Sequence, residues 1–214
     1  MGHPPRTQAQ RREATIAKLV EATIEALAEV GYARTSVSEI CGRAGVSHGG
    51  MFRHFATRLA LIATATASIG QRHVAAIEGL AEQLPDHTDP VDALLGFVRE
   101  ACRSPTHAAW HEVMVAARTD GALRAEVSPV LQAYEAALHD MAVRVVAPHT
   151  DDPFGVQVAV MSFLHMFDSE AVTRAVYCNA EIEEARVAWA AVSKVGAQRG
   201  CRRWERLLCT SAPP

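Results

Sequence analysis

Long apolar runs are scarce in this chain of 214 residues. The most apolar stretch, Phe154 to Phe167, contains Gln157 and His165 and is too short to span a bilayer, because a membrane-spanning helix needs about 20 mostly apolar residues. The N-terminus carries arginines but no apolar segment of the kind found in secretory signals. These absences predict a soluble, cytoplasmic protein that has no membrane partner.

Ordered cysteine spacing and catalytic signatures are also missing. The five cysteines are odd in number and form no C-x-x-C pair, which favours a reducing compartment over a disulfide framework. The sequence has no P-loop, no G-x-G-x-x-G and no Ser/His/Asp order. His107 and His111 have a spacing that can chelate a metal, but no third ligand stands near them. We therefore expect no enzyme activity, no cofactor and no metal site.

Patterns long enough for β-strands are absent, and apolar residues recur instead at three- and four-residue spacing. This spacing predicts an all-α chain, with a three-helix module followed by a helical bundle. The expected helices cover residues 11–30, 37–44, 47–54, 57–84, 91–102, 106–118, 120–146, 154–178 and a last one from about 182. We expect a disordered arm over residues 1–10, a first domain over 11–56 and a second domain over 57–214.

Charge is divided unevenly between these two parts. Up to Ala60, eight lysines and arginines stand against five glutamates, whereas the remainder holds 13 basic and 19 acidic residues. A positive module favours nucleic-acid binding, because neutralisation of phosphates supplies most of the non-specific affinity. Taken alone, the imbalance fits chance scatter equally well.

The stretch Thr35 to Phe55 combines two short helical patterns around a break. Side-chain oxygens near Ser36 can cap the first helix, and Gly45 can end it because glycine reaches a left-handed backbone without steric cost. Ser47 can then cap the second helix. Helix, tight glycine turn and capped helix together predict a helix-turn-helix, whose second helix enters a DNA major groove.

Residues 44–55, A-G-V-S-H-G-G-M-F-R-H-F, resemble the signature of the tetracycline-repressor (TetR) family of bacterial regulators, and Gly31-Tyr32 and Thr57-Arg58 match it too. The resemblance implies a double-stranded DNA operator as partner, a homodimer formed through the last two long helices, and a small effector bound in the helical body. Two residues depart from the family pattern. Phe52 replaces a usual tyrosine and so lacks a hydroxyl, and Gly50 replaces a frequent Thr, Ala or Ser.

For the second short helix we expect DNA contact from His48, Gly49, Gly50, Arg53 and His54, with Phe52 at the boundary and Met51 and Phe55 in the core. Two consecutive glycines cost a helix about 1 kcal/mol each relative to alanine, which suggests close backbone approach to DNA. Residues at helix starts can bind phosphate, and an ordinary cap or surface charge is the alternative for each. These candidates are Thr35, Ser36, Ser47 and Arg58.

Aromatic and methionine side chains of the later helices can line an apolar pocket with a histidine as polar contact, and simple core packing is the alternative. The candidates are Phe97, Trp110, His111, Met114, Phe163, His165 and Met166. The sequence thus predicts a ligand-responsive DNA-binding regulator, a repressor that binds a palindromic operator as a dimer. The alternative is a helical small-molecule-binding or enzymatic protein whose helix-turn-helix no longer reads DNA, for which Phe52 and Gly50 are the only support.

Overall fold

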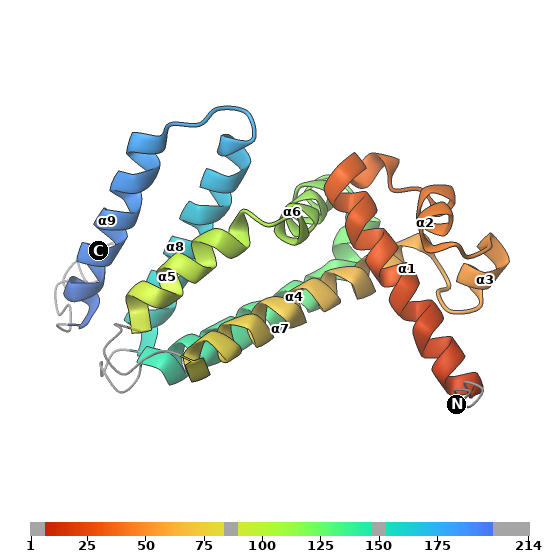
Figure 1. The fold of residues 1–214 in the computed structure, drawn as a ribbon, viewed down its shortest axis with the longest axis horizontal. Helices are drawn as coiled ribbons and strands as arrows, with labels where there is room; N and C mark the ends of the chain where they lie inside the picture. Colours follow the sequence, from red (N-terminus) through yellow and green to blue (C-terminus); the bar gives the residue numbers. More distant parts are fainter. Residues whose placement is uncertain (1–6, 84–89, 147–152, 199–214) are drawn as a thin grey trace, which may run out of the picture. The chain divides into compact units, whose positions relative to one another are not determined.

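The computed structural model describes residues 7–83, 90–146 and 153–198, and every regular element in these ranges is a helix, as predicted (Figure 1). The loops predicted over 85–90 and 148–153 lie outside the described residues except for their last prolines, Pro90 and Pro153, which are the first residues of α5 and α8. The elements are α1 (Gln8–Val30), the 3₁₀-helix η1 (Tyr32–Arg34), α2 (Val37–Ala44), α3 (His48–Phe52), α4 (Arg58–Gln83), α5 (Pro90–Cys102), α6 (Pro105–Ala117), α7 (Gly121–Val146), α8 (Pro153–Arg174) and α9 (Ala180–Gln198). None of the described helices is both long and apolar enough to cross a membrane.

The ends of α2 and α3 follow the local chemistry of the chain. The Ser36 hydroxyl accepts a hydrogen bond from the Glu39 N–H at 3.1 Å, and the Ser47 hydroxyl accepts one from the Gly50 N–H at 3.1 Å. Between them Gly45 adopts a left-handed backbone with φ 63° and ends α2. The predicted helix-turn-helix is therefore present, and Figure 1 shows its two helices in orange.

The later helices begin at caps of the same kind. Thr57 Oγ1 accepts a hydrogen bond from the Ala60 N–H at 3.0 Å, and Asp120 Oδ1 accepts one from the Leu123 N–H at 3.0 Å, so α4 and α7 begin at side-chain caps where the expected helices 57–84 and 120–146 start. A further cap was not anticipated. Ser104 Oγ accepts from the backbone N–H three residues ahead, so that α6 begins one residue earlier than expected.

The ends of several helices differ from the prediction. The expected disordered arm is too long, because Thr7 and Gln10 form a reciprocal capping box at the start of α1. Residues 1–6 lie outside the described residues. Within the helix-turn-helix, α3 ends at Phe52 and Arg53 is its C-cap, so this helix is shorter than the predicted range 47–54.

The chain packs as two compact units, and their limits do not coincide with the predicted boundary after residue 56. Of the described residues, the first unit joins 7–73 with 104–134, and the second joins 74–83 and 90–103 with 135–146 and 153–198. Within the first unit α1 packs along α6, so the helix-turn-helix shares its core with part of the bundle. The large side chains fully buried in that core are Leu19, Leu27, Ile40, Met51, Leu61, Ile62, Ile69, Val113, Leu123 and Val127.

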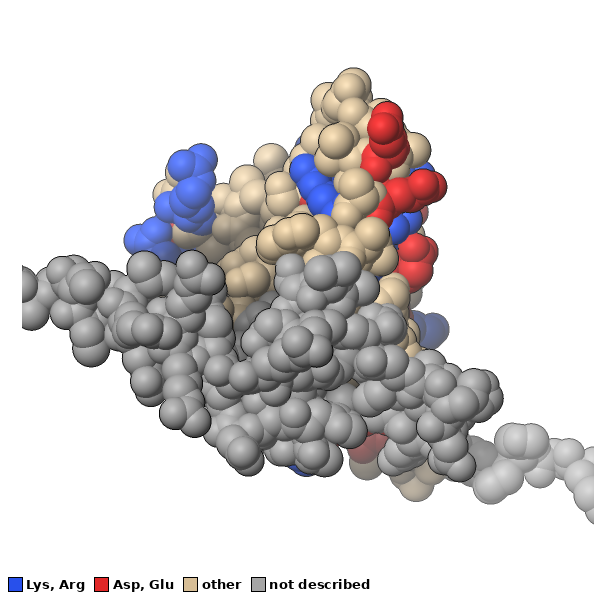
Figure 2. Space-filling model, turned by 90° about the vertical axis from the view of Figure 1, so that its left-hand side faces the viewer, with Lys and Arg blue, Asp and Glu red and all other residues tan. Residues whose placement is uncertain are grey.

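The second unit has a smaller apolar core, in which Leu95 and Cys102 of α5 lie with Phe167 of α8. The helix α9 packs against both α5 and α8. Figure 2 views the molecule from the side where α8 and α9 lie in Figure 1. Where that face is described, much of its surface is uncharged, acidic side chains lie along one edge, and basic side chains are visible both beside them and elsewhere on the face.

Buried carboxylates join the three helices of the second unit. Glu170 of α8 accepts hydrogen bonds from Arg99 and Arg103 of α5, each at 2.7 Å. Glu183 of α9 accepts from Arg103 at 3.1 Å and also from Arg174. Because both carboxylates are almost fully buried, the arginines replace the water that these charges lose on folding.

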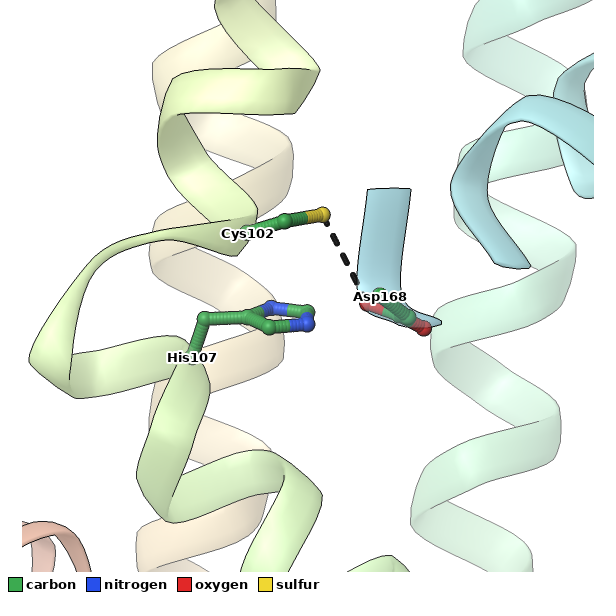
Figure 3. A group of neighbouring side chains, drawn as sticks. All are labelled: Cys102, His107 and Asp168. Atoms are coloured by element: carbon green, nitrogen blue, oxygen red, sulfur yellow. Dashed lines mark hydrogen bonds between the residues drawn. The ribbon is translucent and has the colours of Figure 1, made fainter. Parts of the chain in front are cut away.

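Two cysteine side chains of the second unit donate to carboxylates, and the described cysteines are free thiols. Cys102 donates its thiol hydrogen to Asp168 Oδ1 over 3.5 Å (Figure 3). Burial, and then the charge of Asp168, raise the pKa of the Cys102 thiol, which therefore stays protonated. Cys178 is exposed and donates to Glu183 Oε1 over 3.4 Å. Cys201 and Cys209 lie outside the described residues.

Candidate nucleic-acid interface

The short helix α3 has one face in the core and one face in solvent. Met51 is completely buried and Phe55 is 8% exposed, so both pack inward as expected. His48, Gly49 and Phe52 face outward, and the Phe52 side chain is 51% exposed. The predicted core positions of Met51 and Phe55 and the open positions of His48 and Gly49 are therefore confirmed, whereas Phe52, expected at the boundary, lies on the open face.

Polar groups of this open face have few partners inside the protein. His48 Nε2 lies 3.4 Å from the Ser38 hydroxyl, which links the start of α3 to α2. The Arg53 guanidinium is exposed and has no hydrogen-bond or ion-pair partner in the part of the chain that the structure describes. Ser36 and Ser47 are exposed but act as helix caps, which is the alternative expected for them.

Two of the predicted DNA contacts point into the protein. Thr35 is 0% exposed and its hydroxyl donates to the Gly31 carbonyl at 2.8 Å, so the predicted phosphate contact by this side chain is wrong. His54 lies beyond the end of α3 and is half-buried. Its Nδ1 atom is buried and has no hydrogen-bond partner among the described residues, so this edge of the ring faces the protein.

Arg58 forms hydrogen bonds inside the first unit, next to the helix-turn-helix, and its guanidinium is therefore not available as a phosphate ligand. Its guanidinium donates to the backbone carbonyls of Thr35 and Tyr32, at 2.5 and 2.6 Å. The same group lies over the Tyr32 ring, 4.5 Å from the ring centroid, in a cation–π contact. The sequence placed Arg58 at the DNA because it starts a helix, but the nearest acceptors are carbonyls of η1 and of the residue that follows it.

Sequence reasoning also missed what holds the helix-turn-helix against the rest of its unit. The Tyr32 N–H donates to Glu112 Oε2 of α6 at 3.0 Å, and the Tyr32 hydroxyl donates to Asp120 Oδ2 at 2.8 Å. Burial, and then the bond to Asp120, raise the pKa of the Tyr32 hydroxyl, which keeps it a donor. The partners are 80 and 88 residues away along the chain, so no local pattern signals them.

The two glycines of α3 have different reasons to be there. A Cβ atom at Gly50 would lie 2.9 Å from Val46 Cγ1 and 3.2 Å from Ser47 Oγ, so the packing of the turn itself excludes a side chain. A Cβ atom at Gly49 would meet no protein atom within 4 Å. The expectation that both glycines serve a close approach to DNA is therefore unnecessary for Gly50 and stands only for Gly49.

The candidate effector residues are divided between the two compact units. Trp110 is buried in the first unit, where its ring centroid lies 4.6 Å from that of Tyr134. His111 is half-buried there, and Met114 is 40% exposed. The remaining candidates belong to the second unit, where three are half-buried and the histidine is exposed: Phe97, Phe163, Met166 and His165. Neither unit by itself contains the whole set.

Comparison with known proteins identifies the same segment. The family model of the bacterial regulatory proteins of the tetR family matches residues 19–65, which include the whole helix-turn-helix. An HTH-type transcriptional regulator of Mycobacterium tuberculosis is 38% identical over 184 residues, which cover 85% of this chain and 93% of the relative. The HTH-type transcriptional regulator CymR of Pseudomonas putida is 28% identical over 136 residues, or 64% of this chain and 67% of CymR.

The fold recurs in solved structures. A TetR-family transcriptional regulator from Mesorhizobium loti superposes with a TM-score of 0.68 at 17% identity, over 90% of this chain and 98% of the other. The mycobacterial relative is similar over almost its whole length, so the likeness extends well beyond the helix-turn-helix. This chain therefore belongs to the TetR family of bacterial regulatory proteins, and it is a DNA-binding transcriptional regulator.

Proposed function

We propose that this protein is a ligand-responsive repressor, which binds a palindromic double-stranded operator as a homodimer. The observation that carries the DNA part is the geometry of α3. Two side chains, Met51 and Phe55, anchor this helix in the core, while His48, Gly49 and Arg53 stand in solvent with no described protein contact that would block a duplex. A helix presented in this way fits a major groove.

The partners of the arginines in and next to the helix-turn-helix support Arg53 as the main DNA contact. Arg43 is nearby in sequence, but its guanidinium forms ion pairs with Glu29 at 2.6 Å and Glu39 at 2.7 Å, so its charge is largely neutralised. Arg58 is held by backbone carbonyls. Arg53 has no such partner among the described residues and can donate to a guanine edge or to a phosphate.

Binding to the DNA upstream of the protein's own gene tests the proposal. Fluorescence anisotropy should show a specific complex whose log affinity falls linearly with log salt concentration. Arg53→Ala should weaken that complex about 5- to 150-fold, the range that corresponds to about 1–3 kcal/mol for one base contact. The control is Arg118→Ala, which removes an equal charge from an exposed site at the end of α6. Equal affinity of the Arg53 variant and the wild type would contradict the assignment.

The exposed faces of α8 and α9 support the homodimer. On α8, Val158 is 47% and Val172 is 44% exposed, and on α9, Ile182 is 48% and Trp189 is 63% exposed. Exposed positions on α8 recur at helical spacing, which makes one continuous face: 158, 162, 165, 169 and 172. A second copy of the same helices would remove these apolar groups from water, and such isologous pairing is the commonest form of oligomer.

Sedimentation velocity tests this pairing. The wild type should sediment as a dimer, and Trp189→Glu should shift the population towards monomer and weaken operator binding in parallel. Val115→Glu is the matched control, because Val115 of α6 is similarly exposed, at 52%, but lies in the other compact unit. A monomeric wild type that still binds a full palindrome would contradict the dimer.

The effector part of the proposal rests on aromatic groups near the centre of the first unit. Trp110 is almost buried beside Tyr134 and His73. An apolar ligand that contacts these rings would change the fluorescence of Trp110. Ligand acts on DNA binding only through a difference in affinity between two conformations. A panel of apolar metabolites should therefore contain one that lowers operator affinity and quenches wild-type fluorescence, with the quenching reduced in Trp110→Phe. If no member of the panel changes operator affinity, the ligand-responsive part of the proposal is wrong and the protein is a constitutive regulator.

The alternative of a helix-turn-helix that has lost DNA binding is weaker than the sequence suggested. Gly50 no longer supports it, because the glycine is explained by the contact with Val46. Phe52 remains as support, although this side chain is on the open face and not in the core. The anisotropy experiment decides between the two functions, since the alternative requires equal affinity for upstream and unrelated DNA.

A further inference from the structure

An exposed phenylalanine stands in the middle of the surface proposed to meet DNA. Phe52 is 51% exposed, although burial of a phenylalanine side chain contributes about 1.5–3 kcal/mol to stability. Its neighbour Met51 is 0% exposed, and Phe55, four residues after Met51, is 8% exposed. Met51 and Phe52 are neighbours on α3, and successive helical residues point about 100° apart, so the side of α3 that buries Met51 in the core leaves Phe52 on the open side. The ring is therefore left for a contact outside the described chain.

The chemistry of the ring limits what that contact can be. A phenyl group has no hydrogen-bond donor or acceptor, so it cannot bind a phosphate oxygen as a tyrosine hydroxyl would. The edge of an A·T pair carries the C5-methyl group of thymine into the major groove, and this apolar group distinguishes thymine from the other bases there. A phenylalanine can contact this methyl group and shield it from water.

We infer that Phe52 is a specificity-determining residue, which reads the C5-methyl group of a thymine in each half of the operator. This inference rests on the proposed function, because it assumes that α3 enters the major groove. It assigns different tasks to neighbouring side chains. Arg53, which is exposed and without a described partner, supplies charge and hydrogen bonds, while Phe52 supplies an apolar contact that selects an A·T pair.

The experiment replaces thymine by uracil in the operator, which deletes only the methyl group. The full-length protein is titrated against duplexes that carry one dT→dU replacement per half-site, at each thymine in turn. One position should weaken wild-type binding about four-fold per half-site, the factor expected for about 0.8 kcal/mol from one buried methyl. Thymines in the flanking DNA serve as controls and should show no change.

Variants of Phe52 identify the protein side of the contact. Phe52→Ala should bind more weakly and respond equally to thymine and uracil at the sensitive position, because the group that senses the methyl is gone. Phe52→Leu should keep a preference for thymine, since leucine remains apolar. The ring is exposed, so thermal unfolding of both variants should match that of the wild type and exclude a folding defect.

The possible results separate this inference from the function on which it rests. If no specific DNA complex forms, the proposed function fails together with the inference. If a specific complex forms but no thymine is sensitive, or if Phe52→Ala keeps the full uracil effect, only the inference is overturned. A Phe52→Tyr variant that binds more tightly while no thymine is sensitive would place the ring at the phosphate backbone, and this too would overturn it.

Discussion

Polar groups are used in opposite ways in the helix-turn-helix and in the second compact unit. In the helix-turn-helix, Ser36 and Ser47 each bond a backbone N–H three residues ahead. In the second unit, Glu170 takes its partners from Arg99 and Arg103, 71 and 67 residues earlier. The first arrangement forms wherever the local sequence permits it, whereas the second exists only when the helices have packed. Changes to long-range pairs should therefore cost more stability than changes to the surface of α3.

The largest expected effect is the loss of a buried charge. Glu170→Gln leaves Arg99 and Arg103 facing an uncharged amide, and removal of one partner from a buried ion pair costs about 3–5 kcal/mol. Because both arginines keep some exposure and retain Glu183 as a partner, at 3.8 Å from Arg99 and 3.1 Å from Arg103, we expect at most about 3 kcal/mol, measured by urea denaturation. Glu100→Gln is the control, because that residue also pairs with Arg103 but its side chain is 73% exposed. Its change should stay below about 1 kcal/mol, and equal losses in the two variants would refute the contrast.

The second largest effect concerns the hydrogen bond from the Tyr32 hydroxyl to Asp120, which links the segment before the helix-turn-helix to the start of α7. Tyr32→Phe keeps the ring under Arg58 but removes the hydroxyl that donates to Asp120. Hydrogen bonds to charged groups contribute about 1.5–3 kcal/mol, so the free energy of unfolding should fall by about 1.5 kcal/mol. Double-mutant cycles with Asp120→Ala should then show strong coupling between the two sites. Additive losses would mean that the hydroxyl contributes nothing through this carboxylate.

The adjacent glycines of α3 should respond with opposite signs. Gly49→Ala adds a methyl group in open space and should raise stability by about 0.5–1 kcal/mol, because glycine is the poorer helix former. Gly50→Ala places the same methyl group against Val46 and should lower stability. Thermal unfolding measures both. If Gly49→Ala also weakens operator binding while it stabilises the protein, the missing side chain at this position is required by DNA.

The smallest effect is a dependence on pH from Asp120. The Leu123 N–H, and then the Tyr32 hydroxyl, hold the pKa of this carboxyl below its ordinary value of 3.8. A lowered folded-state pKa stabilises the protein above the unfolded value, and this contribution is lost as the pH falls through the folded value. Asp120→Asn keeps a capping oxygen but cannot titrate. The stability advantage of the wild type over this variant should therefore shrink below about pH 4, and a constant difference would contradict it.

Agreement between sequence and structure followed the range of the interactions involved. The caps at Ser36, Ser47 and Thr57 and the turn at Gly45 were predictable, because each depends on residues within four positions. The caps at Thr7 and Ser104 are equally local and were missed, whereas the errors in the candidate site arose where a residue had a distant partner or a packed neighbour. Arg58 looked like a phosphate ligand until the carbonyls of η1 and Thr35 took its hydrogen bonds.

Local chemistry along the chain was enough to specify an all-helical regulator with a capped reading helix, because helix periodicity, capping and turn glycines act over one or two turns. Three-dimensional packing was needed to decide which side chains of that helix are free. Packing buries Thr35, brings Val46 so close to Gly50 that a side chain there would clash, and leaves Phe52 in solvent. Burial depends on how side chains pack in three dimensions, which the spacing of residue types along the chain does not specify.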